Sequence, residues 1–427
     1  MSEKTYHLET LALHAGHVPD PTTLARAVPV YRTTAYNFRD SQHGANLFAL
    51  RELGNIYSRL MNPTNDVLEK RLAALEGGAA ALTLASGTAA VYFTITNILR
   101  QGDEFVAANN LYGGTFTQFD AILPQQGITV RWTPVNDFAA VEAAIHAKTR
   151  AIYIETVGNP GLDVADIAGY AALAKKYHLP LIVDATFTPP TLLRPIEHGA
   201  DIVIHSLSKW IGGHGTAIGG VVIDAGKFDW TDPKFALFNE PDRGYHGLRF
   251  AHDLGPLNPL AFILRLRTVG LRNQGATLAP DAAWIFLQGV ETLSLRMIKH
   301  SENAYRVATF LKNHPKVAWV KHPGLDGTPY AQTYLPNGAG GMVVFGVKGS
   351  AADAMKVVDN IALFSLLANV GDAKSLIIHP ASTTHSQLSP EDLEKSGVTP
   401  EMIRLSIGLE HIDDILDALN EALASLE

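Results

Sequence analysis

Strand-like and helix-like segments alternate through the middle of the chain, from about residue 64 to residue 208. Each short apolar run is followed by a turn and then by a segment of helical period. The strand-like runs are ALTLAS (81–86), DEFVAAN (103–109), ITVRWTPV (128–135), RAIYIET (150–156), PLIVDAT (180–186) and ADIVIHSLS (200–208). This alternation predicts a mostly parallel sheet with helices on both faces, which is an α/β fold.

Periodicity divides the 427 residues into three predicted parts. Residues 1–63 show little periodicity and are predicted to form an arm that contacts partners elsewhere. Residues 64–290 are predicted to form the large sheet domain, and residues 291–427 a smaller α+β domain. Residues 225–280 are aromatic and turn-rich, without a helix or strand pattern, and are interpreted as an ordered insertion. A long helix is predicted from about Asp281 to Leu311.

The segment TNDVLEKRLAALEGG predicts a helix at the start of the large domain. Thr64 or Asn65 is expected to cap its N-terminus, because short polar side chains accept hydrogen bonds from the first free amides. Gly77 and Gly78 are expected to end it.

Composition excludes several classes of protein. The net charge is −8 and no basic run stands out, so a role in binding nucleic acid or anionic membranes is not expected. The absence of cysteine excludes disulfides, thiolate-bound zinc and a cysteine nucleophile. Only 18% of the residues are charged, against a usual value of about 25%, which predicts that surface is buried against another subunit.

Targeting signals are not expected. The polar start MSEKTYHLET lacks the apolar core of a secretory signal. The longest uncharged stretch, Gly77 to Leu99, contains Ser86-Gly87-Thr88 and is interpreted as a buried strand, a turn and a buried helix. A cytoplasmic location is therefore expected.

Polar side chains follow five of the predicted strands. Because ligands of an open parallel sheet bind beyond the carboxyl ends of its strands, these groups are expected to meet at one rim. They are Ser86, Gly87 and Thr88, then Tyr112, then Asn159, then Asp184, and finally Ser206, Ser208 and Lys209.

Lys209 and Asp184 carry the most specific chemistry. A lysine among apolar groups has a lowered pKa and becomes an amine nucleophile, although a lone lysine here is more often a solvated side chain. Asp184 is either a helix cap or the partner of a cation. An imine-forming lysine with an aspartate opposite a pyridinium nitrogen is the pyridoxal phosphate (PLP) arrangement. Gly87 and Thr88 at a helix start, with the Ser206 and Ser208 hydroxyls, would bind a phosphate and favour this interpretation.

Four further residues have two interpretations each. Tyr112 can stack on a flat cofactor or pack as a turn tyrosine. Tyr57 and Arg59 in the arm can reach a phosphate, even across a subunit interface, or pair at the surface. Arg404 can clamp a carboxylate or form a core salt bridge.

The histidines lack paired metal-ligand spacing, so no metal site is predicted from His205, His214, His246, His252, His379 and His385.

The segments that carry these residues resemble the Cys/Met-metabolism family of PLP-dependent enzymes, whose fold is that of the aspartate-aminotransferase-like PLP transferases (fold type I). The resemblance runs through nearly the whole chain, in YSRLMNPT, ASGTAA, NNLYGGT, ETVGNP, VDATF, HSLSKWIGGHGT and RLSIGLE. The segments KWIGGHGTAIGGVVID and NVGDAKSLIIHPASTTHSQL are most similar to the O-acetylhomoserine sulfhydrylase branch. The chain departs from the family pattern at Thr88, Ala185 and Ser208.

The resemblance implies a role for each matching residue. Lys209 would bind the cofactor's aldehyde covalently, Asp184 would pair with its ring nitrogen, and Tyr112 would stack on the ring. The phosphate and its surroundings would be held by Ser86, Gly87, Thr88, Asn159, Thr186, Ser206 and Ser208, joined by Tyr57 and Arg59 from a neighbouring subunit. Arg404 would take the substrate carboxylate, with help from Asn159, Tyr57 and the backbone near Ser375.

The resemblance also implies an activity: the acetyl group of O-acetyl-L-homoserine is replaced by sulfide, giving L-homocysteine for methionine biosynthesis. It implies a homo-oligomer, a tetramer built from dimers that share active sites. The alternatives within the family are an O-succinylhomoserine sulfhydrylase, a cystathionine γ-synthase and a methionine γ-lyase. A PLP aminotransferase is a different class on the same fold, and a non-enzymatic relative is disfavoured because both Lys209 and Asp184 are present.

Overall fold

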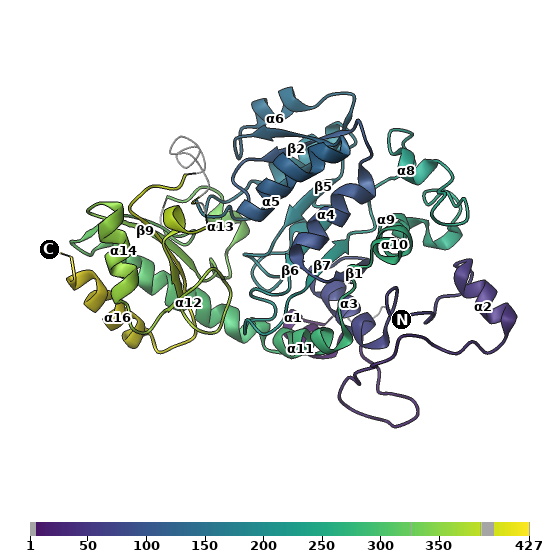
Figure 1. Cartoon of the computed structure of the whole chain (residues 1–427), viewed down its shortest axis with the longest axis horizontal. Coiled ribbons are helices and arrows are strands. Elements are labelled where there is room, and N and C mark those ends of the chain that lie inside the picture. Colours follow the sequence, from purple (N-terminus) through teal and green to yellow (C-terminus); the bar gives the residue numbers. More distant parts are fainter. Residues whose placement is uncertain (1–5, 326, 385, 387–396, 427) are drawn as a thin grey trace.

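Two β-sheets organise the protein in the computed structural model, which describes residues 6–325, 327–384, 386 and 397–426 (Figure 1). The larger sheet has the strand order β1-β7-β6-β5-β4-β2-β3. Only β7 runs antiparallel to its neighbours, β1 and β6; the other neighbouring pairs in this sheet are parallel. The strands are β1 (Ala80–Leu84), β2 (Glu104–Ala108), β3 (Thr129–Thr133), β4 (Thr149–Glu155), β5 (Leu181–Asp184), β6 (Ile202–Ser206) and β7 (Gly220–Asp224).

Helices cover both faces of this sheet, because successive strand residues point to opposite sides. On β6, Val203 packs in a core with helices α3, α7 and α11, whereas Ile202 and Ile204 pack in a second core with α4. The bounds are α3 (Pro63–Glu76), α4 (Gly87–Ile98), α7 (Ile167–Lys176) and α11 (Pro280–Glu291). The remaining elements between β2 and β6 are α5 (Gly113–Thr117), η1 (Gln118–Ile122), η2 (Leu123–Gln126), α6 (Phe138–Ala144) and η3 (Pro195–His198). The predicted α/β class is confirmed.

The predicted cap of α3, Thr64 or Asn65, is wrong by two or three residues. Asn62 caps the helix, and its side chain accepts a hydrogen bond from the Thr64 amide at 2.9 Å. The side chains of Thr64 and Asn65 are used in tertiary contacts, since they donate to the carbonyls of Pro29 and Leu278. Gly77 ends the helix as predicted, with a φ of 74° that suits glycine.

Residues 225–280 contain more regular structure than predicted. They form α8 (Ala236–Asn239), η4 (Gly255–Leu260), α9 (Ala261–Arg265), η5 (Leu266–Leu271) and α10 (Arg272–Gln274). Their aromatic side chains are buried in the core beneath α4, where Trp230 stacks on Phe238 and Phe262. The segment is therefore part of the core of the large sheet, and its aromatic content reflects burial.

The smaller sheet has the order β10-β11-β12-β9-β8. Its strands are β8 (Val317–Lys321), β9 (Met342–Val347), β10 (Ser365–Leu366), β11 (Leu376–Ile378) and β12 (Met402–Ser406). Its helices are α12 (Leu293–Lys312), α13 (Ala331–Tyr334), α14 (Ala351–Asn360), η6 (Pro380–Ser382) and α16 (Ile412–Ala424). The single long helix predicted from Asp281 is divided into α11 and α12 at Thr292. The domain boundaries at residues 63 and 290 stay predictions.

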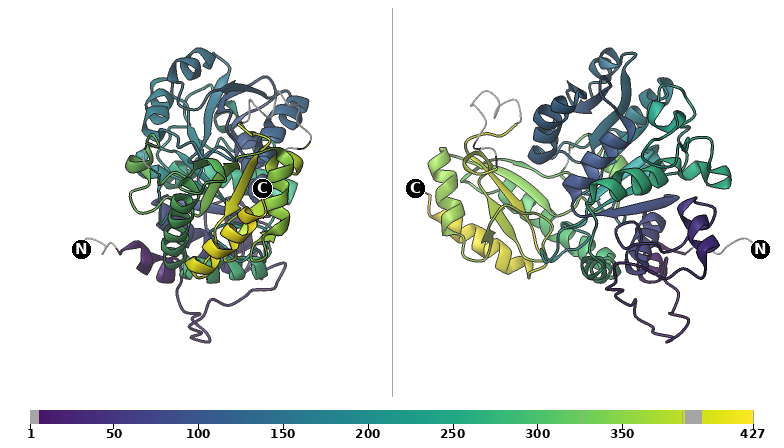
Figure 2. Two further views of the ribbon diagram at one scale, coloured as in Figure 1. Left: turned by 90° about the vertical axis from the view of Figure 1, so that its left-hand side faces the viewer. Right: turned by 45° about the vertical axis from the view of Figure 1, so that its right-hand side comes forward.

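The N-terminal segment has one part that packs on its own chain and one that does not. Helix α1 (Leu8–His14) lies against α3, and the Arg71 side chain donates to the Ala15 carbonyl at 3.0 Å. The loop that carries α2 (Ser41–Phe48) projects away from the body of the molecule in Figures 1 and 2. Among the described residues, no helix is long and apolar enough to cross a membrane.

Candidate active site

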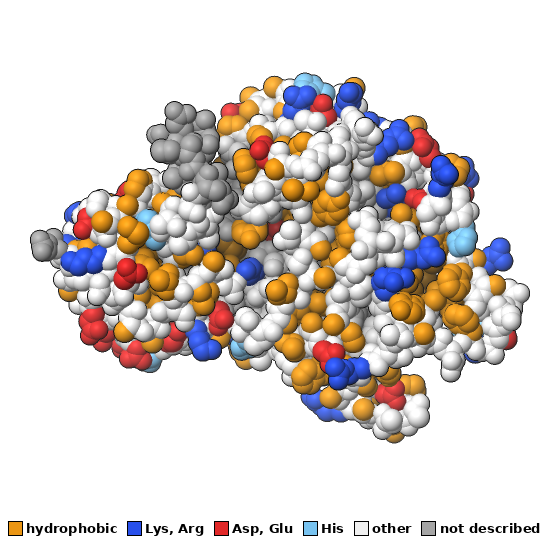
Figure 3. Space-filling view, viewed as in Figure 1, with side chains coloured by type: hydrophobic (Ala, Val, Ile, Leu, Met, Phe, Trp, Pro, Cys, Tyr) orange, Lys and Arg blue, Asp and Glu red, His pale blue; other side chains and the backbone are white. Residues whose placement is uncertain are grey.

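A cavity of about 560 Å³ lies at the carboxyl ends of β4, β5 and β6, between the two lobes, where the surface in Figure 3 is hollowed. Most of the side chains predicted to form a site line it. They are Ser86, Gly87, Thr88, Tyr112, Asn159, Asp184, Thr186, Ser206, Ser208, Lys209 and Arg404. The strand ends of the larger sheet bring these residues together, as predicted, and Arg404 joins them from the smaller sheet.

Lys209 lies in the turn that follows β6 and is largely buried. Its Nζ donates a hydrogen bond to Oδ1 of Asn369 at 2.5 Å. Burial lowers the pKa of Lys209, and the positive charge of Arg404 lowers it further. Both effects favour the neutral amine, which is the nucleophilic form.

Asp184 ends β5 beside the turn that carries Lys209. Its Oδ1 accepts from the Thr186 amide at 2.9 Å, and its Oδ2 accepts from the Tyr153 hydroxyl at 3.4 Å. Burial raises the pKa of Asp184, because desolvation penalises the carboxylate. A cationic ring nitrogen placed against it would relieve this penalty, so the site favours a protonated heterocycle.

The N-terminus of α4 forms a second part of the cavity wall. Ser86 caps the helix by accepting from the Ala89 amide at 3.0 Å, and the amides of Gly87 and Thr88 belong to the first turn, which has no intrahelical acceptors. A Cβ on Gly87 would lie 2.7 Å from the Cβ of Ser206. Glycine at this position therefore lets the end of β6 approach the first turn of α4, whose free amides can bind an anion.

The two serines predicted to bind phosphate, Ser206 and Ser208, are held in place by hydrogen bonds to neighbouring residues. Ser206 donates its amide to the Thr186 hydroxyl at 2.9 Å, which fixes the end of β6 against the turn after β5. The Ser208 hydroxyl accepts from the Gly219 amide at 3.0 Å. Ser208 is thus held within the wall of the cavity by the strand that follows.

Arg404 enters the cavity from β12 of the smaller sheet. It is 6% exposed, and its Nη1 donates to Oδ1 of Asn159 at 3.0 Å. Burial lowers its pKa to about 10. Because this partner is a neutral amide, the guanidinium keeps its charge and its second edge for an anionic ligand.

Three predicted residues are not among those lining the cavity. Tyr57 and Arg59 lie exposed in the projecting arm, with the guanidinium 5.2 Å from the centroid of the tyrosine ring. Ser375 is fully buried, and its hydroxyl and amide are bonded to the carboxylate of Glu410. His385, one of the histidines from which no metal site was predicted, lies outside the described residues.

Glu155 and Asn369 are among the lining residues that the sequence prediction missed. Glu155 ends β4 in register with Asp184, and its Oε1 accepts from the Tyr112 amide at 2.7 Å. Burial raises the pKa of Glu155 well above its ordinary value, and the nearby Asp184 raises it further. Its place at a strand end, like that of Asp184, was the available signal. Asn369 comes from a loop of the smaller sheet and had no such signal.

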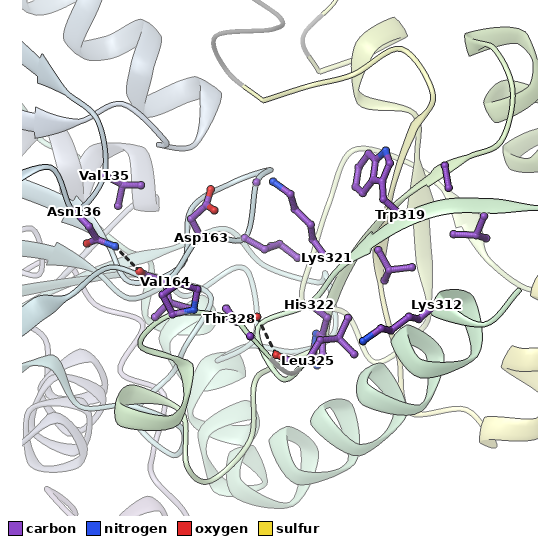
Figure 4. Close-up of a pocket in the computed structure, with 17 residues that line it drawn as sticks. Val135, Asn136, Asp163, Val164, Lys312, Trp319, Lys321, His322, Leu325 and Thr328 are labelled. Atoms are coloured by element: carbon purple, nitrogen blue, oxygen red, sulfur yellow. Dashed lines mark hydrogen bonds between the residues drawn. The ribbon is translucent and has the colours of Figure 1, made fainter.

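A second cavity lies on the other side of the loop that follows β4 (Figure 4). It is lined by Asp163 and Val164 from that loop, and by Lys312, Trp319 and Lys321 from the smaller domain. It contains none of the predicted site residues, so the candidate active site is the cavity around Lys209.

A family model for the Cys/Met metabolism PLP-dependent enzymes matches residues 9–424. The chain belongs to this family. Within the family, it is 52% identical to an O-acetyl-L-homoserine sulfhydrylase of Leptospira meyeri, over 99% of this chain and 98% of that one. It is 49% identical to a homocysteine synthase of Schizosaccharomyces pombe, over 99% of each chain. The resemblance stated from the sequence is confirmed.

A solved structure agrees in fold as well. The chain superimposes with a TM-score of 0.94 on a Campylobacter jejuni protein described as an O-acetylhomoserine (thiol)-lyase, at 44% identity over 98% of this chain and 100% of that one. That protein carries N'-pyridoxyl-lysine-5'-monophosphate. The fold prediction is confirmed, and so is the prediction of a PLP-dependent enzyme.

The side chains of this chain fit the family's cofactor. The buried Asp184 suits the ring nitrogen, and Lys209, with its lowered pKa, suits the aldehyde. The free amides of the first turn of α4, which lies against Ser206, suit the phosphate. A Cβ on Gly220 would meet the carbonyl oxygen of Ser86 at 2.2 Å, so glycine is also required at the strand behind this turn.

Proposed function

We propose that the protein is an O-acetylhomoserine sulfhydrylase, which replaces the acetyl group of O-acetyl-L-homoserine with sulfide and releases L-homocysteine and acetate. The observation that carries the proposal is the single cavity that unites Lys209, Asp184 and Arg404. The proposal is supported by relatives with this name from Leptospira meyeri and, at 44% identity over 98% of this chain, from Corynebacterium glutamicum.

Each of these three residues has a separate task in that reaction. When bound, PLP supplies a ring that stabilises negative charge at the substrate Cα. Asp184 holds a proton on the ring nitrogen, because its buried carboxylate is stabilised by a cation there. Arg404, oriented by Asn159, binds the substrate carboxylate. Lys209, as a neutral amine, takes the proton from Cα.

The replacement itself occurs at the γ carbon. A proton leaves Cβ as the bond between Cγ and the ester oxygen breaks, and acetate leaves with that electron pair. Hydrosulfide then adds to Cγ, and protons return to Cβ and Cα to give homocysteine. The Tyr112 loop, held by the hydrogen bond from the Tyr112 amide to Glu155, forms one wall of the cavity in which this carbon would lie.

The proposal includes an assembly. Tyr57 and Arg59 lie on an exposed arm, outside the cavity of their own chain. In a dimer, such an arm can bring a phenol and a guanidinium to the partner's phosphate site, and two such dimers form the proposed tetramer. A biosynthetic enzyme of this kind is proposed to act in the cytoplasm.

The experiment that tests the proposal compares acyl donors. Purified protein is supplied with PLP and sulfide, and homocysteine is measured with O-acetyl- or O-succinyl-L-homoserine. The proposal predicts rapid homocysteine formation from the acetyl ester. Formation of a 2-oxo acid without loss of acetate would identify an aminotransferase instead.

A further inference from the structure

The amine of Lys209 has a defined partner in a segment that the proposed function leaves without a role. Its Nζ donates to Oδ1 of Asn369 at 2.5 Å. Lys209 belongs to the turn after β6 of the larger sheet, whereas Asn369 lies in the loop between β10 and β11 of the smaller sheet. The contact therefore joins the proposed catalytic amine to the other domain.

The loop that carries Asn369 is fixed on both sides. The Gly371 amide donates to the Ser406 hydroxyl at 2.9 Å, within the smaller sheet. The Ala373 amide donates to the Gly213 carbonyl at 2.8 Å, in the larger domain. Before Asn369, the Leu367 amide donates to the Ile377 carbonyl at 3.4 Å, so hydrogen bonds hold the loop on either side of Asn369.

A glycine permits the close approach of this loop to Lys209. Gly371 has a φ of 80°, and a Cβ there would lie 2.6 Å from the amide nitrogen of Trp210 and 3.0 Å from the Cα of Lys209. The loop thus lies directly against the backbone of Lys209, and it delivers the Asn369 amide group to the end of the lysine side chain.

The type of side chain at position 369 affects the charge of the Lys209 amine, because charged groups already surround this amine. The titratable side chains lining the cavity are Tyr112, Glu155, Asp184, Lys209 and Arg404. Asp372, in the same loop, lies beside Gly215. An amide oxygen orients the amine without adding negative charge, whereas a carboxylate at position 369 would favour the ammonium form.

We propose that Asn369 is a positioning residue that holds the Lys209 amine, in its neutral form, whenever this amine is not bonded to the cofactor. The inference deepens the proposed function, since an amine released by the incoming substrate must be oriented to take the Cα proton. It assigns to Asn369 a contact with the base and none with the substrate or the cofactor. The direction of the lowered pKa of Lys209, caused by burial and Arg404, agrees with a neutral partner.

The first test measures the titration of Lys209 without any amino-acid substrate. The apoenzyme is mixed with PLP, and the second-order rate of uptake is followed by absorbance across pH, because only the neutral amine attacks the aldehyde. Asn369→Asp places a carboxylate against the amine and is expected to move the midpoint of the profile upward by about 1 to 3 pH units. Asn360→Asp, an exposed position on α14, is the charge-matched control and is expected to leave the midpoint unchanged.

The second test separates orientation from folding. Asn369→Ala is expected to lower kcat about tenfold to a hundredfold, with KM for the acyl ester and the melting temperature close to the wild-type values. An unmoved midpoint in Asn369→Asp, or a wild-type kcat in Asn369→Ala, would overturn the proposal. Because the uptake assay contains no acyl-homoserine, its result does not depend on which ester is the substrate.

Discussion

The guanidinium of Arg404 donates to the side-chain oxygen of Asn159 at 3.0 Å, although the two residues lie 245 positions apart in the chain. Arg404 is on β12 of the smaller sheet, and Asn159 follows β4 of the larger sheet. The pair joins the two sheets, so the proposed carboxylate site requires both of them to be in place. The neutral partner leaves the charge of the guanidinium available to a substrate.

Replacement of Arg404 by lysine tests this pair as a carboxylate clamp. Arg404→Lys is expected to retain PLP but to lose roughly a hundredfold in kcat/KM for O-acetylhomoserine, about 3 kcal/mol, because a lysine cannot grip a carboxylate at two points. The exposed Arg306→Lys on α12 is the matched control. A mutant that is only less heat-stable, with normal substrate binding, would show that Arg404 is a structural arginine.

Gly87→Ala tests the phosphate site. The added methyl group would lie 2.7 Å from the Cβ of Ser206, so the first turn of α4 and the end of β6 would have to move apart. The dissociation constant of PLP from the apoenzyme is expected to rise at least about tenfold. Gly270→Ala is the control, since its added Cβ meets only a Leu266 methyl at 3.5 Å. Equal PLP affinity in both variants would show that the phosphate does not bind at this position.

Asp224 is expected to make the stability of the protein depend on pH. It is 2% exposed, and burial raises its pKa from 3.8 to about 7. The folded state therefore binds this proton more tightly than the unfolded state, so the free energy of unfolding falls as the pH rises from about 4 to 7. An asparagine at position 224 does not ionise, so the free energy of unfolding of Asp224→Asn does not fall for this reason. The variant is expected to be more stable than wild type above pH 7, by up to about 4 kcal/mol.

Denaturant unfolding of wild type, Asp224→Asn and the exposed control Asp417→Asn at several pH values measures this effect. The difference between Asp224→Asn and wild type should grow between pH 4 and pH 7 and then level off. Parallel curves for the two proteins across this range would mean that Asp224 ionises normally in the fold.

The projecting arm predicts active sites shared between subunits. Arg59 is exposed on its own chain and is not among the residues lining the cavity. Subunits of Lys209→Ala and Arg59→Ala, each inactive or weak alone, are therefore expected to regain activity when mixed. Random exchange in dimers would restore about a quarter of the wild-type sites, since half of the dimers are hybrids with one intact site. If hybrid dimers are shown to form but have no activity, Arg59 does not contribute to the active site of the other subunit.

The strand ends of the larger sheet were predictable because the relevant pattern is local. Asp184 and Lys209 each follow an apolar run, and the carboxyl ends of parallel strands meet at one edge of a sheet. The helix stop at Gly77 was predictable for the same reason, since a left-handed backbone conformation favours glycine wherever it occurs.

Tertiary contacts explain what the sequence did not reveal. Thr64 and Asn65 suit a helix cap by residue type, but their side chains bond distant carbonyls, and Asn62 takes the cap instead. Asn369 is brought to Lys209 by a loop anchored to two domains, 160 residues away in the chain. In residues 225–280, short helices of different types interrupt one another, so no single period persists.

The central claim concerns the reaction, and one assay tests it most directly. Wild type and Lys209→Ala are each supplied with PLP, sulfide and O-acetyl-L-homoserine, and homocysteine and acetate are quantified. The account predicts equal amounts of both products from wild type, a much slower reaction with O-succinyl-L-homoserine, and no products above background from Lys209→Ala. Acetate release without homocysteine, or full activity in Lys209→Ala, would contradict it.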